Sequence, residues 1–385
     1  MDEAVEELTI HKLTLEETHR KHGATFAGRD GWMLPANYGN AGAEYEAIRG
    51  ADGAGLIDLS TARSRIEVSG AEAVQFLNGL ITNDMKTLAA GARMPAAFPN
   101  VQGRLLANVR VMRPGEETSF LFDTETATRE KVFQTLARFT LAGDFRVRDI
   151  SRETAQLSLQ GAKSPAIIET VLGSIAAHTG RGRVTGVSWR DAHPVTITRA
   201  THTGEDGYDV FIAAGAAAAL WEALTEAGAR PVGFETFEIL RVEAGVPRYG
   251  VDVSEANVVL EAGQEEAVSY TKGCYVGQEI IARIHWRGHV AKRLAGLVLE
   301  DQRELAAEAK VRSTDGKEIG RITSAVFSPR LARTVALGVI RYDYLQPGTQ
   351  VAVVSGEDAR AAQVAELPFV RGSWYATSAG DEETN

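Results

Sequence analysis

Cysteine is almost absent from this chain, which has one cysteine in 385 residues. A single cysteine excludes a disulfide bond within the chain and is typical of a reducing compartment. The sequence also lacks an apolar run near the ~18 to 20 residues that a membrane-spanning helix needs. Its acidic first residues contain no basic stretch followed by an apolar one, so they do not predict a signal peptide. We therefore expect a soluble cytoplasmic protein.

Basic residues are fewer than acidic ones, 41 against 51, so the formal net charge of the chain is -10. An acidic protein repels phosphate backbones, so general nucleic-acid binding is not expected. One local stretch departs from this balance, with four cations and no acid between them: Arg283, Arg287, Lys292 and Arg293. Two interpretations stay open for it, a binding site for an anion and a solvated, charged strand edge.

What the sequence does have is ordinary globular composition, with 44% hydrophobic and 24% charged residues. Its length suggests two or three domains. Alternating residues at 63–68 predict a half-buried strand, which ends at a Ser-Gly pair and is followed by a helical pattern. Weaker copies of this unit are predicted at 156–172 and 208–227. Such units favour related α+β subdomains over a parallel doubly wound sheet.

A β-hairpin is predicted at 94–112, because the residues at 99–103 have turn chemistry. Beyond the turn the residues alternate along a strand. Asn108 therefore shares one strand face with Leu106 and Arg110.

After about residue 290 the pattern changes to short β-like runs separated by turn signals. Strands of this length and spacing predict a small β-barrel or sandwich. The runs are 294–299, 310–312, 318–324, 335–340 and 350–354. We place a core at 1–285, the barrel domain at 286–375 and a polar tail, predicted to be disordered, at 376–385.

The sharpest segment surrounds the single cysteine and reads Lys-Gly-Cys-Tyr-Val-Gly-Gln-Glu at 272–279. A helical run follows, so Cys274 near a helix N-terminus and beside Lys272 would be an activated nucleophile or soft-metal ligand. The alternative is a small buried thiol. A closed metal site is not expected, since there is no second cysteine and His285 and His289 form an isolated pair. A cluster shared with a partner stays open, as does a Cys–His pair with His202 or His285.

Two further segments are informative: a tight turn entering a strand at 203–209, and the end of a helix at 239–245. Gly245 is a candidate for the helix C-cap. Arg241 lies beside the apolar face of this helix. It either pairs with Glu238 or forms a bidentate contact with a ligand carboxylate.

Taken in order, these segments resemble the glycine-cleavage T-protein (aminomethyltransferase) superfamily over nearly the whole chain. Within it they resemble the YgfZ-like proteins and their mitochondrial iron–sulfur assembly relatives. The matching segments are 22–38, 58–60, 66–70, 203–209, 240–245 and the C-terminal barrel. The octet at 272–279 is similar to the YgfZ signature. Besides Lys272 and Cys274, the residues of this signature loop are Gly273, Tyr275, Gly277, Gln278, Glu279 and, just beyond, Arg283.

The resemblance implies an α+β fold: interleaved subdomains around a folate channel, closed by a C-terminal antiparallel β-barrel. It implies tetrahydrofolate, or another reduced folate, as the ligand. Asp209 stands where the family has the acidic residue that contacts the pterin, and Arg241 where it has the arginine that completes the folate site. We expect Asn108 and His202 to line the same site.

The chain departs from the family at the catalytic acids. Aminomethyltransferases carry paired aspartates where this chain has Ala107-Asn108. Alanine has no proton-transfer chemistry, and asparagine has no negative charge to stabilise a cationic intermediate. We therefore do not expect a classical aminomethyltransferase.

The leading hypothesis is a tetrahydrofolate-binding accessory protein that supports iron–sulfur cluster assembly or repair, including clusters of tRNA-modifying enzymes. Cys274 would be its reactive or cluster-touching thiol, tuned by Lys272 and Arg283. One alternative is a folate-dependent aminomethyl- or methyltransferase with an altered donor, and another is a ligand-free scaffold. The expected partners are folate and iron–sulfur proteins or assembly factors, with no direct nucleic acid and no membrane.

Overall fold

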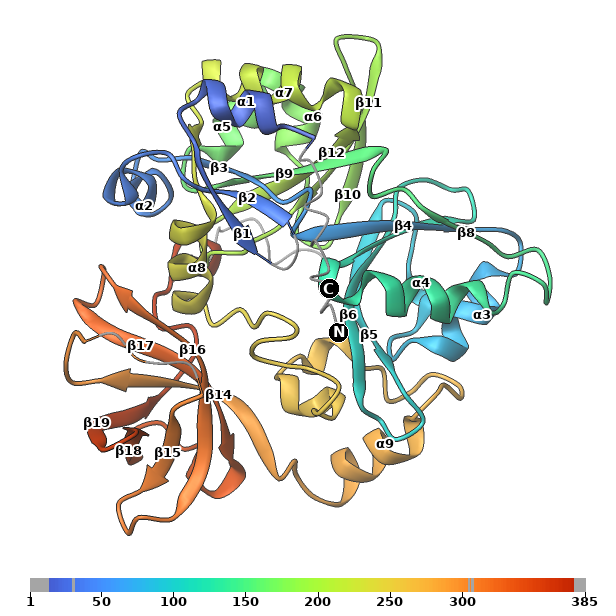
Figure 1. Cartoon of the computed structure of the whole chain (residues 1–385). Helices are drawn as coiled ribbons and strands as arrows, with labels where there is room; N and C mark the ends of the chain where they lie inside the picture. Colours follow the sequence, from blue (N-terminus) through green and yellow to red (C-terminus); the bar gives the residue numbers. More distant parts are fainter. Residues whose placement is uncertain (1–13, 30–31, 304, 306–307, 377–385) are drawn as a thin grey trace, which may run out of the picture.

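The computed structural model describes residues 14–29, 32–303, 305 and 308–376 (Figure 1). Apart from its first residue, the predicted tail at 376–385 lies outside these residues. The chain forms two sheet-containing subdomains, a short hairpin and a closed barrel. Among the described residues, no helix is long and apolar enough to cross a membrane.

The first subdomain is built on a six-stranded sheet, antiparallel except where its last strand joins the sheet. Helices cover its apolar face, and the core between them holds Leu157, Val210 and the buried Trp221. In sheet order the strands are β10 (Val184–Trp189), β11 (His193–Arg199), β12 (Gly207–Ala213), β9 (Thr154–Gln160), β3 (Gly55–Asp58) and β13 (Arg230–Pro231). The helices are α5 (Ser164–Leu172), α6 (Ser174–Ala177) and α7 (Ala214–Glu226).

The second subdomain is built on a five-stranded antiparallel sheet, whose core joins Phe120 and Phe122 to Leu77 and Leu136 of two covering helices. The predicted hairpin is present as its first two strands. In sheet order the strands are β5 (Ala92–Pro99), β6 (Leu105–Arg113), β7 (Ser119–Glu125), β4 (Arg63–Ser69) and β8 (Arg146–Asp149). The helices are α3 (Ala73–Leu80) and α4 (Arg129–Ala137).

The two subdomains are interleaved along the chain. β3 belongs to the six-stranded sheet, β4 to β8 form the other sheet, and β9 returns to the first. Two of the predicted strand–glycine–helix units are β4–α3 and β9–α5. Gly70 between the first pair has a φ of 124°, and a Cβ there would lie 2.0 Å from the Asp144 carbonyl oxygen, so the turn requires glycine. The third predicted unit, β12–α7, is also present.

Helix α8 (Phe234–Glu243) lies where the core meets the barrel (Figure 1). Its Leu240 packs with Tyr45 and Ile48, and its Val242 packs with Leu337 of the barrel. One helix thereby positions its side chains against both parts of the molecule. Of the N-terminal elements, β2 (Trp32–Asn37) and α2 (Ala41–Arg49) contact α8. The other two are β1 (Thr25–Arg29), which pairs with β2, and α1 (Glu16–Lys21), which packs against α7.

The C-terminal part is a closed antiparallel barrel. Of the two architectures predicted for it, a barrel and a sandwich, the barrel is therefore the one that is present. Each of the five predicted runs falls inside one of its strands. The sixth strand was missed because its buried positions are Arg360, Ala362 and Val364, and only one of these three is a large apolar residue. In barrel order the strands are β14 (Lys292–Leu299), β17 (Arg333–Arg341), β16 (Glu318–Ser328), β15 (Lys310–Ser313), β18 (Gln350–Ser355) and β19 (Asp358–Ala365).

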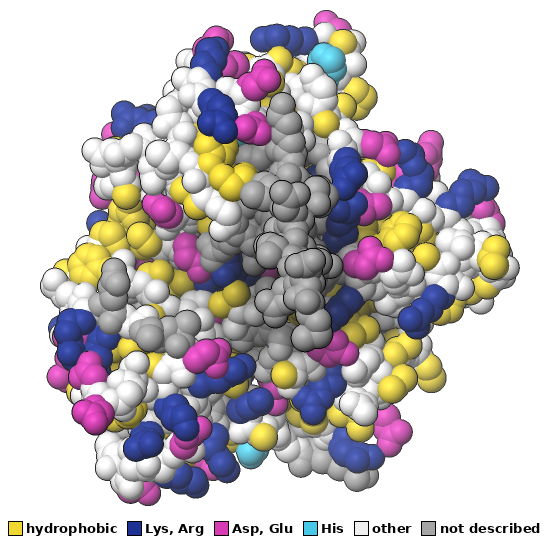
Figure 2. Space-filling view, viewed as in Figure 1, with side chains coloured by type: hydrophobic (Ala, Val, Ile, Leu, Met, Phe, Trp, Pro, Cys, Tyr) yellow, Lys and Arg dark blue, Asp and Glu magenta, His cyan; other side chains and the backbone are white. Residues whose placement is uncertain are grey.

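Helix α9 (Gln278–Arg287) connects the core to the barrel. The predicted fold class is thus confirmed: an α+β core of interleaved subdomains with a C-terminal antiparallel barrel. Basic and acidic side chains are interspersed over the barrel in Figure 2, and several form exposed ion pairs such as Lys310–Glu318. The short 3-10 helices are η1 (Met85–Thr87), η2 (Thr126–Thr128), η3 (Val259–Ala262), η4 (Glu265–Ala267), η5 (Tyr342–Tyr344) and η6 (Ser373–Tyr375).

Candidate functional site

A pocket opens between α8 and the paired ends of β4 and β7, and about 500 Å³ of space lies within it and its solvent-open mouth. Its lining includes both apolar and charged side chains, and α8 contributes residues of both kinds. The apolar side chains are Leu59, Ala62, Phe234, Phe237, Val246 and Pro247; the polar ones are Arg63, Glu125, His202, Glu238, Arg241 and Arg248.

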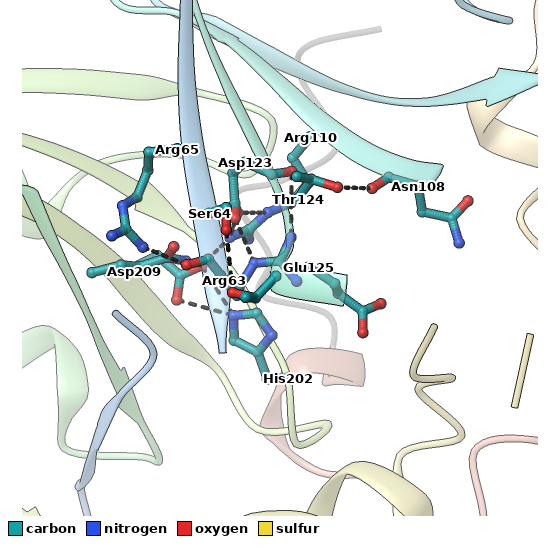
Figure 3. A network of polar contacts seen from close by, with 12 residues as sticks. Arg63, Ser64, Arg65, Asn108, Arg110, Asp123, Thr124, Glu125, His202 and Asp209 are labelled. Atoms are coloured by element: carbon teal, nitrogen blue, oxygen red, sulfur yellow. Dashed lines mark hydrogen bonds and ion pairs between the residues drawn. The ribbon is translucent and has the colours of Figure 1, made fainter. Parts of the chain in front are cut away.

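A buried charge network lies beside this pocket and joins the two sheets (Figure 3). We use this name for Arg63, Arg110, Asp123, His202 and Asp209. Arg110 on β6 donates from Nε to Asp123 on β7 at 2.7 Å and pairs also with Asp209 on β12. Arg63 donates to the other oxygen of Asp123 at 2.5 Å. The side chains of both aspartates are 0% exposed, so each carboxylate depends on these arginines for its neutralisation.

Asp209 also fixes the ring of His202, whose Nε2 lies 3.0 Å from both of its carboxylate oxygens. Because an ionised carboxylate only accepts hydrogen bonds, Nε2–H is the donor. Burial alone would raise the pKa of Asp209, but the charges of His202 and Arg110 outweigh it and hold that pKa well below its usual range. Asp209 thus lies behind His202, which lines the pocket while Asp209 does not.

Glu125 at the end of β7 is the acid on the β7 side of the pocket. Its Oε2 accepts a hydrogen bond from the backbone N–H of Tyr249 at 2.9 Å. Its side chain points away from the buried charge network (Figure 3). Burial raises the pKa of Glu125 above its usual value, and the charges of Arg63, Arg248 and Arg241 offset this only in part.

Arg241 lines the pocket from α8, but its guanidinium is already bound within the protein. It pairs with Asp252 at 2.5 Å and with Glu238, and it donates to Ser324 Oγ at 2.6 Å. The pairing with Glu238, one of the two alternatives open from the sequence, is therefore present. A ligand carboxylate would share this arginine with two acids, and the role of Arg241 in ligand binding stays a prediction.

Asn108 lies on the predicted face of β6, with Leu106 and Arg110 at the alternate, half-buried positions. Its backbone carbonyl accepts a hydrogen bond from Thr124 Oγ1 at 2.9 Å. Its amide points away from the buried charge network in Figure 3, and it is not among the described residues that line the pocket. Asn108 and His202 thus lie in different places, and only His202 reaches the pocket.

The signature loop lies apart from the pocket lining, and Cys274 in it is exposed. Lys272 is buried instead, and its Nζ donates to the carbonyl oxygens of Ile81 at 2.8 Å and Asn83 at 2.6 Å. Burial lowers the pKa of Lys272 to about 8, against a smaller opposing effect of Asp84. The lysine therefore anchors the loop to the core, while the thiol faces solvent.

The other signature residues shape this loop and begin α9. Tyr275 is buried, and the Lys272 ammonium lies 5.0 Å from its ring centroid. Gly273 is exposed, Gly277 has a positive φ just before α9, and Gln278 is the first residue of that helix. Glu279 and Arg283 form an exposed ion pair on α9. These positions support a structural function for most of the octet.

The two histidines near the loop do not form a pair. His285 stacks on Tyr270 with ring centroids 3.7 Å apart, and His289 stacks on Tyr342 at 3.5 Å. Among the described residues, no group of three or more His, Cys, Asp or Glu side chains is arranged to hold a metal ion.

Comparison with known proteins covers almost the whole chain. The family model of the GCVT N-terminal domain matches residues 15–272. That of the glycine cleavage T-protein C-terminal barrel domain matches residues 292–371. The chain belongs to the glycine cleavage T-protein family.

Relatives within this family share the full length of the chain. An aminomethyltransferase of Rubrobacter xylanophilus is 33% identical over 371 residues, covering 96% of both chains. One of Streptomyces coelicolor is 31% identical, covering 94% of this chain and 98% of the relative. The crystal structure of the glycine cleavage system aminomethyltransferase T of Bartonella henselae superposes with a TM-score of 0.86 at 26% identity, covering 94% of this chain and 98% of that one.

Several polar residues of this T-protein family member could not be singled out from sequence. Arg110 and Asp123 face each other across β6 and β7, and Arg63 and Glu125 do so across β4 and β7. The alternation predicted which residues share a face along β4 and β6, and β7 was not among the predicted strands. The alternation did not predict which strands pair, and the opposite charges meet only through that pairing.

Proposed function

We propose that this T-protein family member binds tetrahydrofolate in the α8 pocket and acts as a folate-dependent methyl- or aminomethyltransferase with a donor other than that of glycine cleavage. Full-length relatives named aminomethyltransferase support the reaction class. The observation that carries the proposal is the pocket itself, whose lining combines two phenylalanine rings with carboxyl groups and several arginines.

The residues of the pocket fit a reduced folate. Phe234 and Phe237 offer apolar ring surface to a flat heterocycle. Glu125 offers a carboxyl oxygen to the N–H groups of a pterin edge. Arg248 suits an anionic tail, because its Nε and Nη1 have no hydrogen-bond partner within the described part of the chain. Its ion pair with Glu238 is loose, with Nη1 3.7 Å from the carboxylate.

Tetrahydrofolate, when bound, would supply N5 as the acceptor of a methyl group, with the N5 proton passing to the donor. For an aminomethyl donor it would supply N5 and N10 as the acceptors of the methylene group, with their two protons leaving on ammonia and on the remainder of the donor. The residues of this chain bind and orient the ligand: Asp209 holds His202 at the pocket wall, and Arg63, which is itself held by Asp123, lines the same pocket. Ala107 and Asn108 supply no carboxylate for a cationic donor. The donor is therefore proposed to differ from the aminomethyl group of glycine cleavage.

Calorimetric titration of the purified protein with tetrahydrofolate, without oxygen, tests the binding step. Phe237→Leu keeps apolar volume in the pocket but removes the ring face, so we expect affinity to fall about tenfold, in line with the value of an aromatic stacking contact. Phe327→Leu, on the exposed surface of the barrel, is the matched control and should bind as the parent does. No binding by the parent protein would refute the proposal.

Turnover tests the transfer step once binding is established. The protein is incubated with tetrahydrofolate and a panel of N-methyl, S-methyl and aminomethyl donors, and the folate products are separated by chromatography. We expect 5-methyl- or 5,10-methylenetetrahydrofolate from one donor class. Binding without a product from any donor would favour the accessory role over the transferase.

A second function is supported by the exposed thiol of Cys274 in a loop similar to the YgfZ signature. In this reading the protein is a folate-dependent accessory factor for iron–sulfur proteins, including tRNA-modifying enzymes. Cys274→Ala should then abolish its support of an iron–sulfur enzyme in cells and leave tetrahydrofolate affinity unchanged. Equal loss of both would contradict this division of labour.

A further inference from the structure

Two carboxyl groups near the pocket are candidates to face a ligand, and their surroundings differ sharply. Asp209 is 0% exposed, with both oxygens bound to His202 and one also paired with Arg110. Gln156 adds a further contact at 3.4 Å. Reaching a ligand would require Asp209 to give up these partners and leave Arg110 with less neutralisation, at a large energetic cost.

Glu125 is under no such constraint. Within the described residues, its carboxyl group accepts one hydrogen bond, from the Tyr249 N–H to Oε2. Arg63 lies directly opposite it across β4 and β7, yet the Arg63 guanidinium is bound to Asp123 instead. Glu125 therefore presents a carboxyl group to the pocket with one oxygen uncommitted.

We infer that the ligand-facing carboxyl of this pocket is Glu125 on β7, and that Asp209 on β12 acts only as a positioning residue for His202 and Arg110. The inference rests on the proposed function and assigns its pterin-edge contact. A carboxylate with one free oxygen can accept the paired N–H donors of a 2-amino-4-oxopyrimidine edge, while its other oxygen keeps the Tyr249 bond.

The assignment has a measurable consequence in proton exchange. Burial raises the pKa of the Glu125 carboxyl in the free protein, and the donor N–H groups of a ligand favour its ionised form. Binding should therefore release protons at acidic pH and tighten as pH rises through the pKa of Glu125. The other charged groups facing Glu125 are Arg63 on β4, Glu238 and Arg241 on α8, Arg248 beyond it, and His202.

The experiment compares the parent protein with Glu125→Gln and Asp209→Asn. Each is titrated with tetrahydrofolate without oxygen, between pH 5 and 8, in pairs of buffers with different ionisation enthalpies. Glu125→Gln retains an oxygen for the Tyr249 N–H and leaves Glu238 and His202 unchanged, so it removes only the proton exchange of Glu125. Thermal unfolding of each variant gives the temperature range in which it is folded, and the titrations are carried out within that range.

We expect Glu125→Gln to weaken binding about tenfold or more at neutral pH and to abolish the pH-dependent proton release, as loss of a charge-assisted contact requires. Folded Asp209→Asn loosens the hold on His202, so we expect it to lose less affinity than Glu125→Gln and to keep the pH-dependent proton release. The reverse pattern, loss with Asp209→Asn and normal binding with Glu125→Gln, would overturn the inference while leaving folate binding established. No binding by the parent protein would remove the proposed function and this assignment with it.

Discussion

The buried charge network and the signature loop handle polar groups in opposite ways. In the network, Asp123 and Asp209 are fully buried and paired with two arginines, Arg63 on β4 and Arg110 on β6. In the loop, Lys272 is buried against two backbone carbonyls and the ring of Tyr275, and Cys274, two residues along the chain, is exposed. The charges that hold the two sheets against each other are thus buried and paired with opposite charges. The loop, by contrast, is held by one buried lysine at its base.

The two regions differ in whether folding and ligand binding depend on the same residues. The network places His202 and Arg63 at the wall of a pocket, so its stability and ligand binding are linked. The loop is held by Lys272 and Gly277, and its exposed thiol is free of that link. Changes in the network should therefore alter folding most, and changes at the loop less.

The largest effect is expected from Arg110→Met. It leaves Asp209 with His202 and Asp123 with Arg63 as their remaining partners, and loss of one member of a buried ion network typically costs about 3–5 kcal/mol. Chemical denaturation at pH 7 should show this loss in the free energy of unfolding. Arg321→Met, which breaks an exposed ion pair with Glu308, is the control and should cost below about 1 kcal/mol.

The pH dependence sharpens this prediction. The pKa of Asp123 and that of Asp209 are held below their usual range in the fold, so their stabilisation is complete above the unfolded pKa, near about 4, and is lost as pH falls further. The gap between the parent and Arg110→Met should therefore be widest near neutral pH and narrow in acid. A gap that does not depend on pH would show that Arg110 acts by packing rather than by charge.

The sequence predicted the architecture well because its signals are local. Alternation at 63–68 and the turn at 99–103 define strands and a hairpin without reference to distant residues. The charge network could not be predicted in this way. Asp209 and Arg110 are 99 positions apart and meet only where the two sheets face each other. Pairing of that kind follows from tertiary packing, which residue spacing does not encode.

A smaller effect is expected at the base of the signature loop from Gly277→Ala. Gly277 has a φ of 76°, and a Cβ there would lie 2.4 Å from the Asn100 carbonyl oxygen. Left-handed backbone and overpacking against a rigid carbonyl together cost roughly 2–4 kcal/mol. Gly273→Ala in the same loop is the matched control, since an added Cβ meets no atom within 4 Å. Equal unfolding midpoints for the two variants would show that the loop is not anchored at Gly277.

The loop also shows why a motif can be found without its function. The spacing of 272–279 marks a distinctive segment, but it did not distinguish anchoring residues from reactive ones. Tyr275 and Lys272 are buried, whereas Cys274 between them is exposed. Alternate exposure within four residues is set by the carbonyls of Ile81 and Asn83, which lie far away in the chain. The prediction that Lys272 tunes the thiol stays a prediction.

The smallest effect is expected in the pH dependence that Lys272 adds to stability. Its pKa of about 8 in the fold lies below the ordinary value of 10.5, so between these values the unfolded chain binds more protons than the folded one. Stability of the parent relative to Lys272→Met should therefore rise from about pH 8 to about pH 10, with a slope below about 1.4 kcal/mol per pH unit. Denaturation of both proteins across this range measures the difference, in which the tyrosines common to both cancel. A flat difference would mean that the two carbonyl contacts compensate fully for the loss of water around the ammonium group, and the loop would then be anchored by a lysine with an ordinary pKa.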